Sequence, residues 1–267
     1  MTEAKSVQLD KILTELRSFI IAFSGGVDSS FLAYRSKILN RVKMKAVTIK
    51  TPYMHERETN EATEFANAYK IDHQIINVSF PEIIRHNPVN RCYLCKKNLF
   101  SSIIEYASEN GYSYVLDGSN ADDKLDFRPG LKALKELSVR SPLAEAGLTK
   151  DEIRSLLRKA GLTIWDKPAM ACILTRIPYD TEVTEDMMRM IEKAEDLLFE
   201  EGYPGTRVRV HGETARIECL PGYLEKIVNN PKREVLVSNL KKIGFRYISL
   251  DLEGYRTGSM NPEIRIK

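Results

Sequence analysis

The stretch FIIAFSGGVDSSFLAYRSK, residues 19–37, contains the change of pattern that decides the fold. The apolar run over residues 19–23 is typical of a buried strand, and the apolar positions from Phe31 onward predict a helix that begins at about Asp28. The two glycines between these elements allow backbone conformations that side chains forbid and let another group approach the main chain closely. The free N–H groups at the start of the helix favour an anion, and a phosphate is the obvious guest.

The loop between these two elements is rich in serine and glycine, which separates it from two common phosphate loops. A Walker loop places a lysine directly after its last glycine, whereas here no lysine follows Gly26 until Lys37. The G-x-G-x-x-G fingerprint of dinucleotide-binding proteins is also absent. An ordinary strand-to-helix turn, with Ser24 or Asp28 as its N-cap residue, is the alternative interpretation.

The run SGGVDS, residues 24–29, resembles the S-G-G-x-D-S pyrophosphate loop of ATP pyrophosphatases such as GMP synthetase, NAD synthetase and the tRNA thiolases. The resemblance implies that ATP is cleaved between its α and β phosphates and that a substrate oxygen is adenylated. It also implies Mg²⁺ on the phosphates, with Asp28 near the metal or in the hydrogen bonds of the loop. The residues expected to bind ATP are Ser24, Gly25, Gly26, Val27, Asp28, Ser29 and Ser30.

Length and composition narrow the class of protein. A chain of 267 residues with 43% hydrophobic content is long enough for one large domain, or for a large domain and a smaller one. The balance of 40 Lys and Arg against 37 Asp and Glu gives a net charge of +3, which is too small for a protein that binds nucleic acid mainly by neutralising phosphates. No apolar run approaches the ~20 residues that cross a bilayer, and no signal peptide is evident, so we expect a cytoplasmic protein without a membrane or nucleic-acid partner.

Apolar runs typical of strands alternate with amphipathic patterns typical of helices, which indicates an α/β protein with a doubly wound parallel sheet. Strands are expected at residues 19–23, 44–49, 74–78 and 112–118, and helices at residues 7–16, 29–39, 55–69 and 95–109. Ligands of such sheets gather beyond the carboxyl ends of the strands. The loop that begins at Ser24 and the loop that begins at Asp117 are therefore expected to lie together.

The second part of the chain has a different pattern. Thr149 and Glu152 form a predicted capping box at the start of a helix that ends at Gly161. Beyond residue 180 the pattern predicts a helix at 184–201, strands at 206–210, 214–219 and 245–251, and helices near 222–242. We therefore expect a pyrophosphatase-type domain over residues 1–180 and a smaller α+β domain over residues 181–267 for substrate binding or oligomerisation.

Four cysteines raise a separate question. Cys92 and Cys95 form a C-x-x-C pair, which admits a redox couple, half of a zinc site or part of an iron–sulfur site. A structural zinc lacks further ligands at suitable spacing, and a redox couple alone leaves Cys172 unexplained. Three thiolates can hold three irons of a [4Fe-4S] cluster and leave the fourth iron open. Two buried thiols and one loop thiol without a metal are the alternative, and Cys219 is expected to be a small buried residue.

Motifs over most of the chain together resemble the LarE family. Besides the pyrophosphate loop they are RCYLCKK (91–97), DGSNADD (117–123), FRPGLKAL (127–134), RSPLAE (140–145), WDKPAMACILTRIPY (165–179), TRVRVHGETARIE (206–218) and GFRYISLDLEGYRTGSMN (244–261). The family consists of ATP-dependent sulfur-insertion enzymes that make the thiocarboxylates of the nickel-pincer nucleotide cofactor. The resemblance implies that the substrate is pyridinium-3,5-biscarboxylic acid mononucleotide, whose carboxylate is adenylated before sulfur displaces AMP.

The resemblance also implies the source of the sulfur. Some members use one cysteine, at the position of Cys172, as a sacrificial donor that is left as dehydroalanine. Members with three cysteines resemble this chain more closely, and they imply a [4Fe-4S] cluster held by Cys92, Cys95 and Cys172.

The remaining roles follow from residue type and from the resemblance. The catalytic candidates are Cys172, Asp28 and Arg176, the last as an anion clamp. Arg207 and Arg209, two apart on a predicted strand, share a face and suit the phosphate or carboxylates of the substrate; a solvated basic strand face is the alternative. Residues that could orient substrate or metal, with an ordinary acidic loop as the alternative, are Asp122 and Asp123.

Two other enzymes share the pyrophosphate loop and stay open as alternatives. A tRNA thiolase would also use ATP and cysteines, although the small net charge disfavours it. An amide-forming ligase of the NAD synthetase type would use ammonia, and its cysteines would be dispensable. The family resemblance further implies a homo-oligomer, a hexamer or a dimer.

Overall fold

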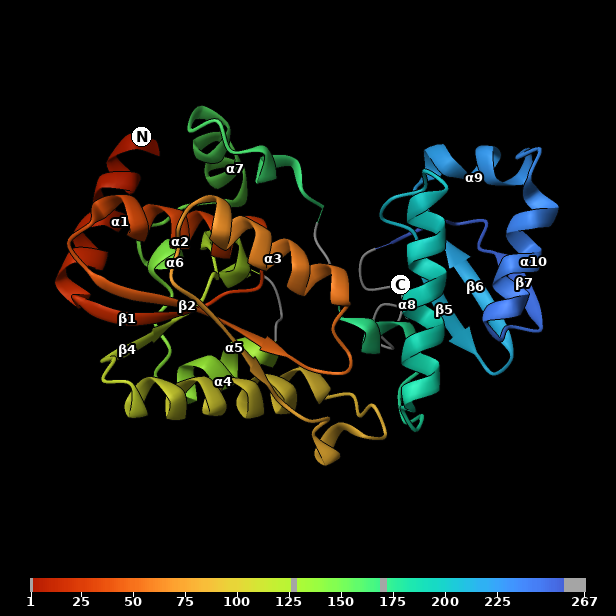
Figure 1. Ribbon diagram of the computed structural model, residues 1–267, viewed down its shortest axis with the longest axis horizontal. Helices are drawn as coiled ribbons and strands as arrows, with labels where there is room; N and C mark the ends of the chain where they lie inside the picture. The colour runs from red at the N-terminus through yellow and green to blue at the C-terminus, as the bar shows by residue number, and fades with distance from the viewer. Residues whose placement is uncertain (1, 126–128, 169–171, 257–267) are drawn as a thin grey trace. The chain divides into compact units, whose positions relative to one another are not determined.

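The computed structural model describes residues 2–125, 129–168 and 172–256 (Figure 1). The chain forms two compact units, one made of Met1–Ile84 with Asn90–Ala169 and the other of Arg85–Val89 with Met170–Lys267. The division therefore falls between residues 169 and 170, where the sequence suggested residue 180. The short excursion of residues 85–89 into the second unit was not expected from the sequence.

Asn87 explains why this short segment belongs to the second unit. Its side-chain amide is buried and donates hydrogen bonds to the carbonyl oxygens of Leu174 at 3.2 Å, Ile177 at 2.8 Å and Pro178 at 3.0 Å. A second link joins Val183 N to the carbonyl oxygen of Arg85 at 2.8 Å. Buried polar groups need such partners, so the segment is held by hydrogen bonds that leave no pattern in the sequence.

The first unit is built on a parallel sheet of four strands. They are β1 (Ser18–Ala22), β2 (Lys43–Lys50), β3 (His73–Asn77) and β4 (Tyr114–Leu116), in the order β3-β2-β1-β4. The sheet grows outward from β1 to β3 and then resumes on the other side of β1 with β4. The strand order thus reverses between β1 and β4, which is where α/β sheets of this kind bind ligands.

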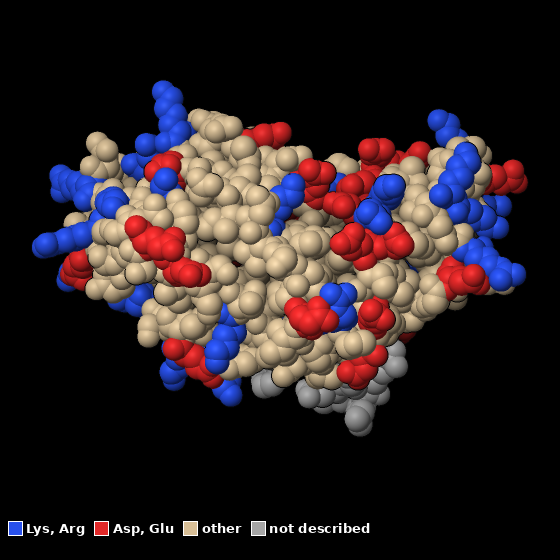
Figure 2. Space-filling model, turned by 60° about the horizontal axis from the view of Figure 1, so that its bottom comes forward, with Lys and Arg blue, Asp and Glu red and all other residues tan. Residues whose placement is uncertain are grey.

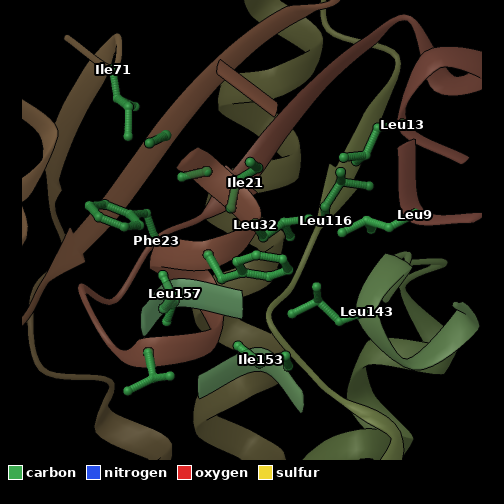
Figure 3. Packing of buried hydrophobic residues seen from close by; sticks show 14 of the residues in the cluster. Leu9, Leu13, Ile21, Phe23, Leu32, Ile71, Leu116, Leu143, Ile153 and Leu157 are labelled. Carbon is green, nitrogen blue, oxygen red and sulfur yellow. The ribbon is translucent and has the colours of Figure 1, made fainter. Parts of the chain in front are cut away.

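Helices cover both faces of this sheet (Figure 1). One face carries α1 (Thr2–Leu16), α2 (Val27–Leu39), α3 (Glu56–Ala68), α6 (Pro142–Glu145) and α7 (Lys150–Lys159), and the other carries α4 (Arg91–Glu109) and α5 (Pro129–Glu136). Neighbouring residues of β1 serve opposite faces: Ile21 packs in the cluster of the first face, drawn in Figure 3, and Ile20 packs with the second. Because both faces are buried, the strand needs a continuous apolar run, and the prediction of a doubly wound α/β fold is confirmed.

The predicted capping box at the start of α7 is also confirmed. Thr149 Oγ1 accepts a hydrogen bond from Glu152 N at 3.3 Å, and Thr149 N donates to Glu152 Oε2 at 3.0 Å. The same carboxylate accepts from Lys5 Nζ at 2.7 Å, which joins α1 to α7. The ammonium of Lys5 and the N–H of Thr149 lower the pKa of Glu152 to about 2.

The second unit contains a smaller sheet with the order β5-β6-β7. Strands β5 (Arg207–His211) and β6 (Thr214–Glu218) form an antiparallel hairpin, and β7 (Tyr247–Leu250) runs parallel to β6. Three helices accompany the sheet: α8 (Glu185–Glu200), α9 (Pro221–Val228) and α10 (Arg233–Ile243). The predicted small α+β arrangement is confirmed, with element ends within a few residues of the expected ones.

Short 3₁₀ helices complete the described part of the chain. They are η1 (Glu82–Ile84), η2 (Ala121–Leu125), η3 (Thr163–Asp166) and η4 (Ile173–Arg176). No helix in the residues that the structure describes has the length and apolar character that crossing a membrane requires.

Replacing Gly25 by alanine is expected to destabilise the first unit. Gly25 has a φ of +65°, and an added Cβ would lie 2.8 Å from the Cβ and 2.9 Å from the Cα of Ala62 in α3. Gly161→Ala is the matched control, because Gly161 has a φ of +74° in the same unit with nothing within 4 Å of the added atom. Both variants should lose about 1 kcal/mol for the left-handed backbone, and Gly25→Ala should lose a further ~1–3 kcal/mol because α3 must shift.

Urea unfolding followed by the fluorescence of the single tryptophan, Trp165, measures both losses. Equal losses in the two variants would show that α3 moves aside without cost.

Candidate active site

The loop after β1 leaves the start of α2 open. Gly26 is the N-cap residue, its backbone is extended, and no side chain makes a capping hydrogen bond there. Ser24 and Asp28 therefore do not cap the helix, and the interpretation of this run as an ordinary capped turn is wrong. An uncapped N-terminus offers its first N–H groups and the positive end of its dipole to an anion.

Serine side chains hold this loop in shape from within. Ser24 Oγ lies 3.1 Å from Ser29 Oγ and accepts a hydrogen bond from Gly26 N at 3.3 Å. Ser29 Oγ donates to the carbonyl oxygen of Gly26 at 3.2 Å. The hydroxyl of Ser30 is buried and has no hydrogen-bond partner in the described part of the chain. The loop is thus an ordered, polar segment held by hydrogen bonds between its main-chain and hydroxyl groups.

The loop after β4 meets the loop after β1, as the sheet topology predicts. A Cβ on Gly118 would lie 3.0 Å from Ser29 N, so a side chain here would push the two loops apart by a few tenths of an ångström. The preceding carboxylate, Asp117, accepts hydrogen bonds from the hydroxyls of Ser119 and of Ser141, the latter at 2.6 Å. These bonds tie the loop to Ser141, directly before α6.

Asp28 is paired with a lysine from a distant segment. Lys150 Nζ lies 2.6 Å from Asp28 Oδ2. Burial raises the pKa of Asp28, the hydrogen bond and charge of Lys150 oppose that rise, and the nearby charge of Asp123 adds to it. Lys150 therefore offsets part of the effect of burial on this carboxylate.

A second lysine supports the same loop. Lys167 Nζ donates to the carbonyl oxygen of Gly25 at 2.8 Å and pairs with Glu61 Oε2 at 2.7 Å. Sequence reasoning missed both lysines. One signal pointed to Lys150. A cation in the first turn of a helix interacts unfavourably with the helix dipole, so its presence there indicates another role.

The two acidic residues proposed for substrate or metal accept hydrogen bonds from main-chain N–H groups. Asp122 Oδ2 accepts from Lys150 N at 2.8 Å at the start of α7. Asp123 is buried, and its Oδ2 accepts from Asn120 N at 2.9 Å. Their clearest structural role is to shape the segment that brings Lys150 to Asp28.

The cysteines are free thiols divided between the two units. Cys92 and Cys95 lie one turn apart at the start of α4, Cys92 exposed and Cys95 half-buried. Cys172 belongs to the second unit, where it is exposed and precedes η4. Cys219 is fully buried, as expected. Among the residues that the structure describes, no three His, Cys, Asp or Glu side chains gather as metal ligands.

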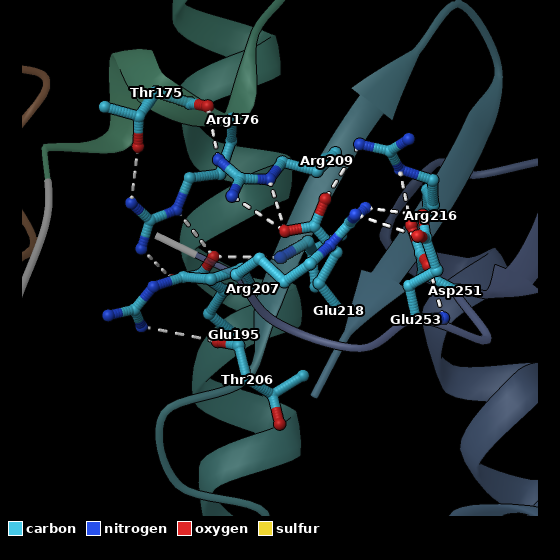
Figure 4. A network of polar contacts seen from close by, with 12 residues as sticks. Thr175, Arg176, Glu195, Thr206, Arg207, Arg209, Arg216, Glu218, Asp251 and Glu253 are labelled. Carbon is cyan, nitrogen blue, oxygen red and sulfur yellow. Dashed lines mark hydrogen bonds and ion pairs between the residues drawn. The ribbon is translucent and has the colours of Figure 1, made fainter. Parts of the chain in front are cut away.

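Two arginines of the second unit, Arg176 and Arg209, are buried in ion pairs (Figure 4). Arg176 forms two hydrogen bonds of 2.8 Å with the carboxylate of Glu195, and Arg209 NH2 lies 2.7 Å from Glu218 Oε2. Arg207 and Arg209 are 7% and 4% exposed, so the interpretation of this strand as a solvated basic face is wrong. Buried guanidinium groups need such partners because desolvation is costly.

These buried pairs position the backbone around Cys172. Arg176 NH1 donates to the carbonyl oxygen of Cys172 at 3.1 Å, and Arg209 NH1 donates to that of Thr175 at 2.5 Å. The third arginine, Arg207, lies over the ring of Tyr255 at 5.5 Å, and burial and the charge of Arg176 lower its pKa. The charge of Glu195 opposes this lowering of the pKa.

Comparisons with known proteins agree with this geometry. The family model of the queuosine biosynthesis protein QueC matches residues 18–93. An uncharacterized protein of Synechocystis is 37% identical over 98% of both chains. The pyridinium-3,5-bisthiocarboxylic acid mononucleotide synthase of Lactiplantibacillus plantarum is 34% identical over 96% of this chain and 94% of its own. The tRNA-specific 2-thiouridylase MnmA of Rickettsia africae is 28% identical over 57% of this chain and 52% of its own.

The parallel sheet and the loop after β1 define the class, an α/β protein with the pyrophosphate loop of ATP pyrophosphatases. Within that class, the end-to-end match with the synthase shows that the chain belongs to the LarE family. The resemblance of its motifs to that family is thereby confirmed.

Asp28→Asn is expected to change how stability depends on pH. Because burial raises the pKa of Asp28 in the folded state, its stabilising contribution is complete below the unfolded pKa and is lost as the pH rises through the folded pKa. The free energy of unfolding of Asp28→Asn, measured relative to that of the wild type, should therefore increase as the pH rises from about 4. The difference should then become constant at higher pH. Urea titrations at several pH values test this. A wild type whose free energy of unfolding increases with pH relative to that of the variant would contradict it.

Glu195→Gln is expected to destabilise the second unit. The change removes one charge of a buried pair, in which Arg176 and Glu195 side chains are 1% and 5% exposed, and should cost about 3–5 kcal/mol. Asp186→Asn is the control, because this residue pairs with Arg189 on the surface and should cost no more than ~1 kcal/mol. Hydrogen exchange of α8 and β5 measures the effect, and equal protection in both variants would show that the buried pair adds nothing.

Proposed function

We propose that this protein uses ATP to insert sulfur into pyridinium-3,5-biscarboxylic acid mononucleotide during the biosynthesis of the nickel-pincer nucleotide cofactor. The observation that carries the proposal is an open pyrophosphate loop at the end of β1 in a chain that matches the L. plantarum synthase almost from end to end. The loop supplies the ATP chemistry, and the match supplies the substrate.

In the first step a carboxylate oxygen of the substrate attacks the α-phosphorus of ATP. The bond between that phosphorus and the bridging oxygen to the β-phosphate breaks, and pyrophosphate leaves. Residues Ser24 to Ser30 are proposed to hold the pyrophosphate with their N–H and hydroxyl groups, because the start of α2 is uncapped. Such transfers depend mainly on in-line positioning and charge neutralisation.

Asp28 and Lys150 are proposed to balance the charges of the metal and of the phosphates in this step. The half-buried carboxylate of Asp28 is paired with Lys150 Nζ at 2.6 Å. Asp28 would hold the Mg²⁺ that accompanies ATP, and Lys150 would pair with a phosphate oxygen, so that each charge would keep a partner. Lys167 would hold the carbonyl oxygen of Gly25 in place meanwhile.

In the second step sulfide attacks the acyl carbon of the adenylate, and AMP leaves with the bonding electrons. The product is a thiocarboxylate, and a second round at the other carboxylate gives the bis-thiocarboxylic product. Arg207 is proposed to bind the substrate phosphate, a role that the family resemblance implies and that suits a guanidinium group. Arg176 and Arg209 are proposed to keep the segment at Cys172 in position.

The sulfur is proposed to come through a [4Fe-4S] cluster held by Cys92, Cys95 and Cys172. Their chemistry fits, since all three are free thiols and two of them lie one helical turn apart. When bound, such a cluster would supply an extra sulfide at the iron that lacks a thiolate ligand. A homo-oligomer, hexamer or dimer, stays a prediction of the family resemblance.

The proposal predicts that protein purified without oxygen consumes ATP only when the mononucleotide is present. Pyrophosphate and AMP should appear in equal amounts, with a thiocarboxylate product in the mass spectrum. Asp28→Asn should lose most of this activity, at least a hundredfold, because the charge beside the phosphates is gone. Pyrophosphate release that needs tRNA or ammonia in place of the mononucleotide would overturn the substrate assignment.

The same preparation tests the sulfur source through its iron content. About four irons per chain are expected, and Cys92→Ala should lose them while Cys219→Ala, at a buried cysteine outside the set, keeps them. Wild-type protein without iron would exclude the cluster, and Cys172 should then appear as dehydroalanine after one turnover.

The tRNA thiolase alternative has little support on the surface. On the face drawn in Figure 2, basic and acidic side chains are interspersed, and the net charge of the chain is only +3. Proteins that bind RNA through its phosphates usually present a continuous basic surface.

A further inference from the structure

The hydroxyl group of a buried tyrosine contacts one cysteine of the C-x-x-C pair. Tyr53 lies in the turn between β2 and α3, and its Oη is 3.2 Å from the Sγ of Cys95. Tyr53 is 1% exposed, and its ring packs edge-on against Phe80 with ring centroids 5.4 Å apart. The Met54 N–H donates to the carbonyl oxygen of Thr51 at 3.2 Å and closes the turn around Tyr53. The hydroxyl is therefore held in place beside the sulfur.

The two thiols of the pair have different surroundings. Cys92 is exposed to water, whereas Cys95 is half-buried and faces the phenol. A hydrogen bond is stronger where water is excluded and where its two groups are already ordered. The contact of Tyr53 with Cys95 thus makes the two sulfurs chemically unequal.

The direction of the hydrogen bond is fixed once Cys95 binds a metal. In the free protein either the thiol or the phenol can be the donor. A cysteine that ligates a metal is a thiolate, which has no proton to give and can only accept. The phenol O–H of Tyr53 must then donate to the sulfur.

We propose that Tyr53 donates a hydrogen bond to the iron-bound sulfur of Cys95 and thereby raises the reduction potential of the cluster. The inference rests on the cluster of the proposed function, and it adds a positioning residue that tunes one of its ligands. Hydrogen bonds to the sulfurs are one of the means by which proteins set cluster potentials. They stabilise the reduced form more because its sulfurs carry more negative charge.

Tyr53→Phe tests the proposal because it removes the hydroxyl and keeps the ring on Phe80. Wild type and variant are loaded with iron and sulfide without oxygen, and the midpoint potential and the Fe–S(Cys) stretching frequencies are measured. The variant should keep its iron, and its potential should shift to a more negative value. Its Fe–S stretching frequency should rise, because a hydrogen bond to the sulfur weakens the iron–sulfur bond. The wild-type frequencies should also respond to D₂O, and those of the variant should respond less.

Tyr34→Phe is the matched control, because Tyr34 packs edge-on against Tyr69 at 5.4 Å on the other face of the sheet. It should leave the potential and the frequencies unchanged. Iron at wild-type content with an unshifted potential in Tyr53→Phe overturns the role of Tyr53 and leaves the cluster proposal standing. Wild-type protein without iron overturns both.

A second substitution covers a Tyr53→Phe protein that folds poorly or loses its iron. Fluorotyrosine at position 53 keeps the ring and the hydroxyl and makes the phenol more acidic, so that it becomes a stronger donor. The potential should then shift to a more positive value than in the wild type. An unchanged potential in that protein overturns the proposal.

Discussion

The loops of the first unit can approach their neighbours closely because two of their residues are glycines, which have no Cβ atom. At Gly25 the loop after β1 comes against Ala62 of α3, and at Gly118 the loop after β4 comes against the main chain of Ser29. Any side chain at either position would meet backbone atoms at about 3 Å or less. Because these approaches are allowed, the loops after β1 and β4 and the helix α3 come together near the uncapped start of α2.

The second unit solves a different physical problem, which is how to keep several arginines out of water. Two of them are paired with carboxylates that are themselves buried, Glu195 and Glu218. Their remaining N–H groups donate hydrogen bonds to main-chain carbonyl oxygens at and near Cys172. Buried ion pairs of this kind contribute little net stability. Their value here is geometric, since a planar guanidinium fixed at both ends holds a loop at a defined distance.

The sequence was sufficient for those features that local patterns encode. The apolar run at residues 19–23, the glycines after it and the capping box at Thr149 each depend on neighbours a few residues away, and all three are found as expected. Contacts across long separations left no such pattern. The pair of Asp28 with Lys150 joins residues 122 positions apart, and the amide of Asn87 reaches carbonyls 87 to 91 positions away. The arginines were recognised from the family motifs, but whether they face solvent or buried carboxylates depends on the packing of α8 and β5.

The pair of Asp28 with Lys150 has a consequence for how the loop receives a nucleotide. A buried carboxylate without a counter-ion would draw in the nearest cation or take up a proton, and its loop would rearrange to allow this. Lys150 arrives from α7, whose position is fixed by the capping box and by Asp122. The loop therefore carries an internal counter-ion that can be exchanged for an external one, and little reorganisation energy is needed when ATP and its metal arrive.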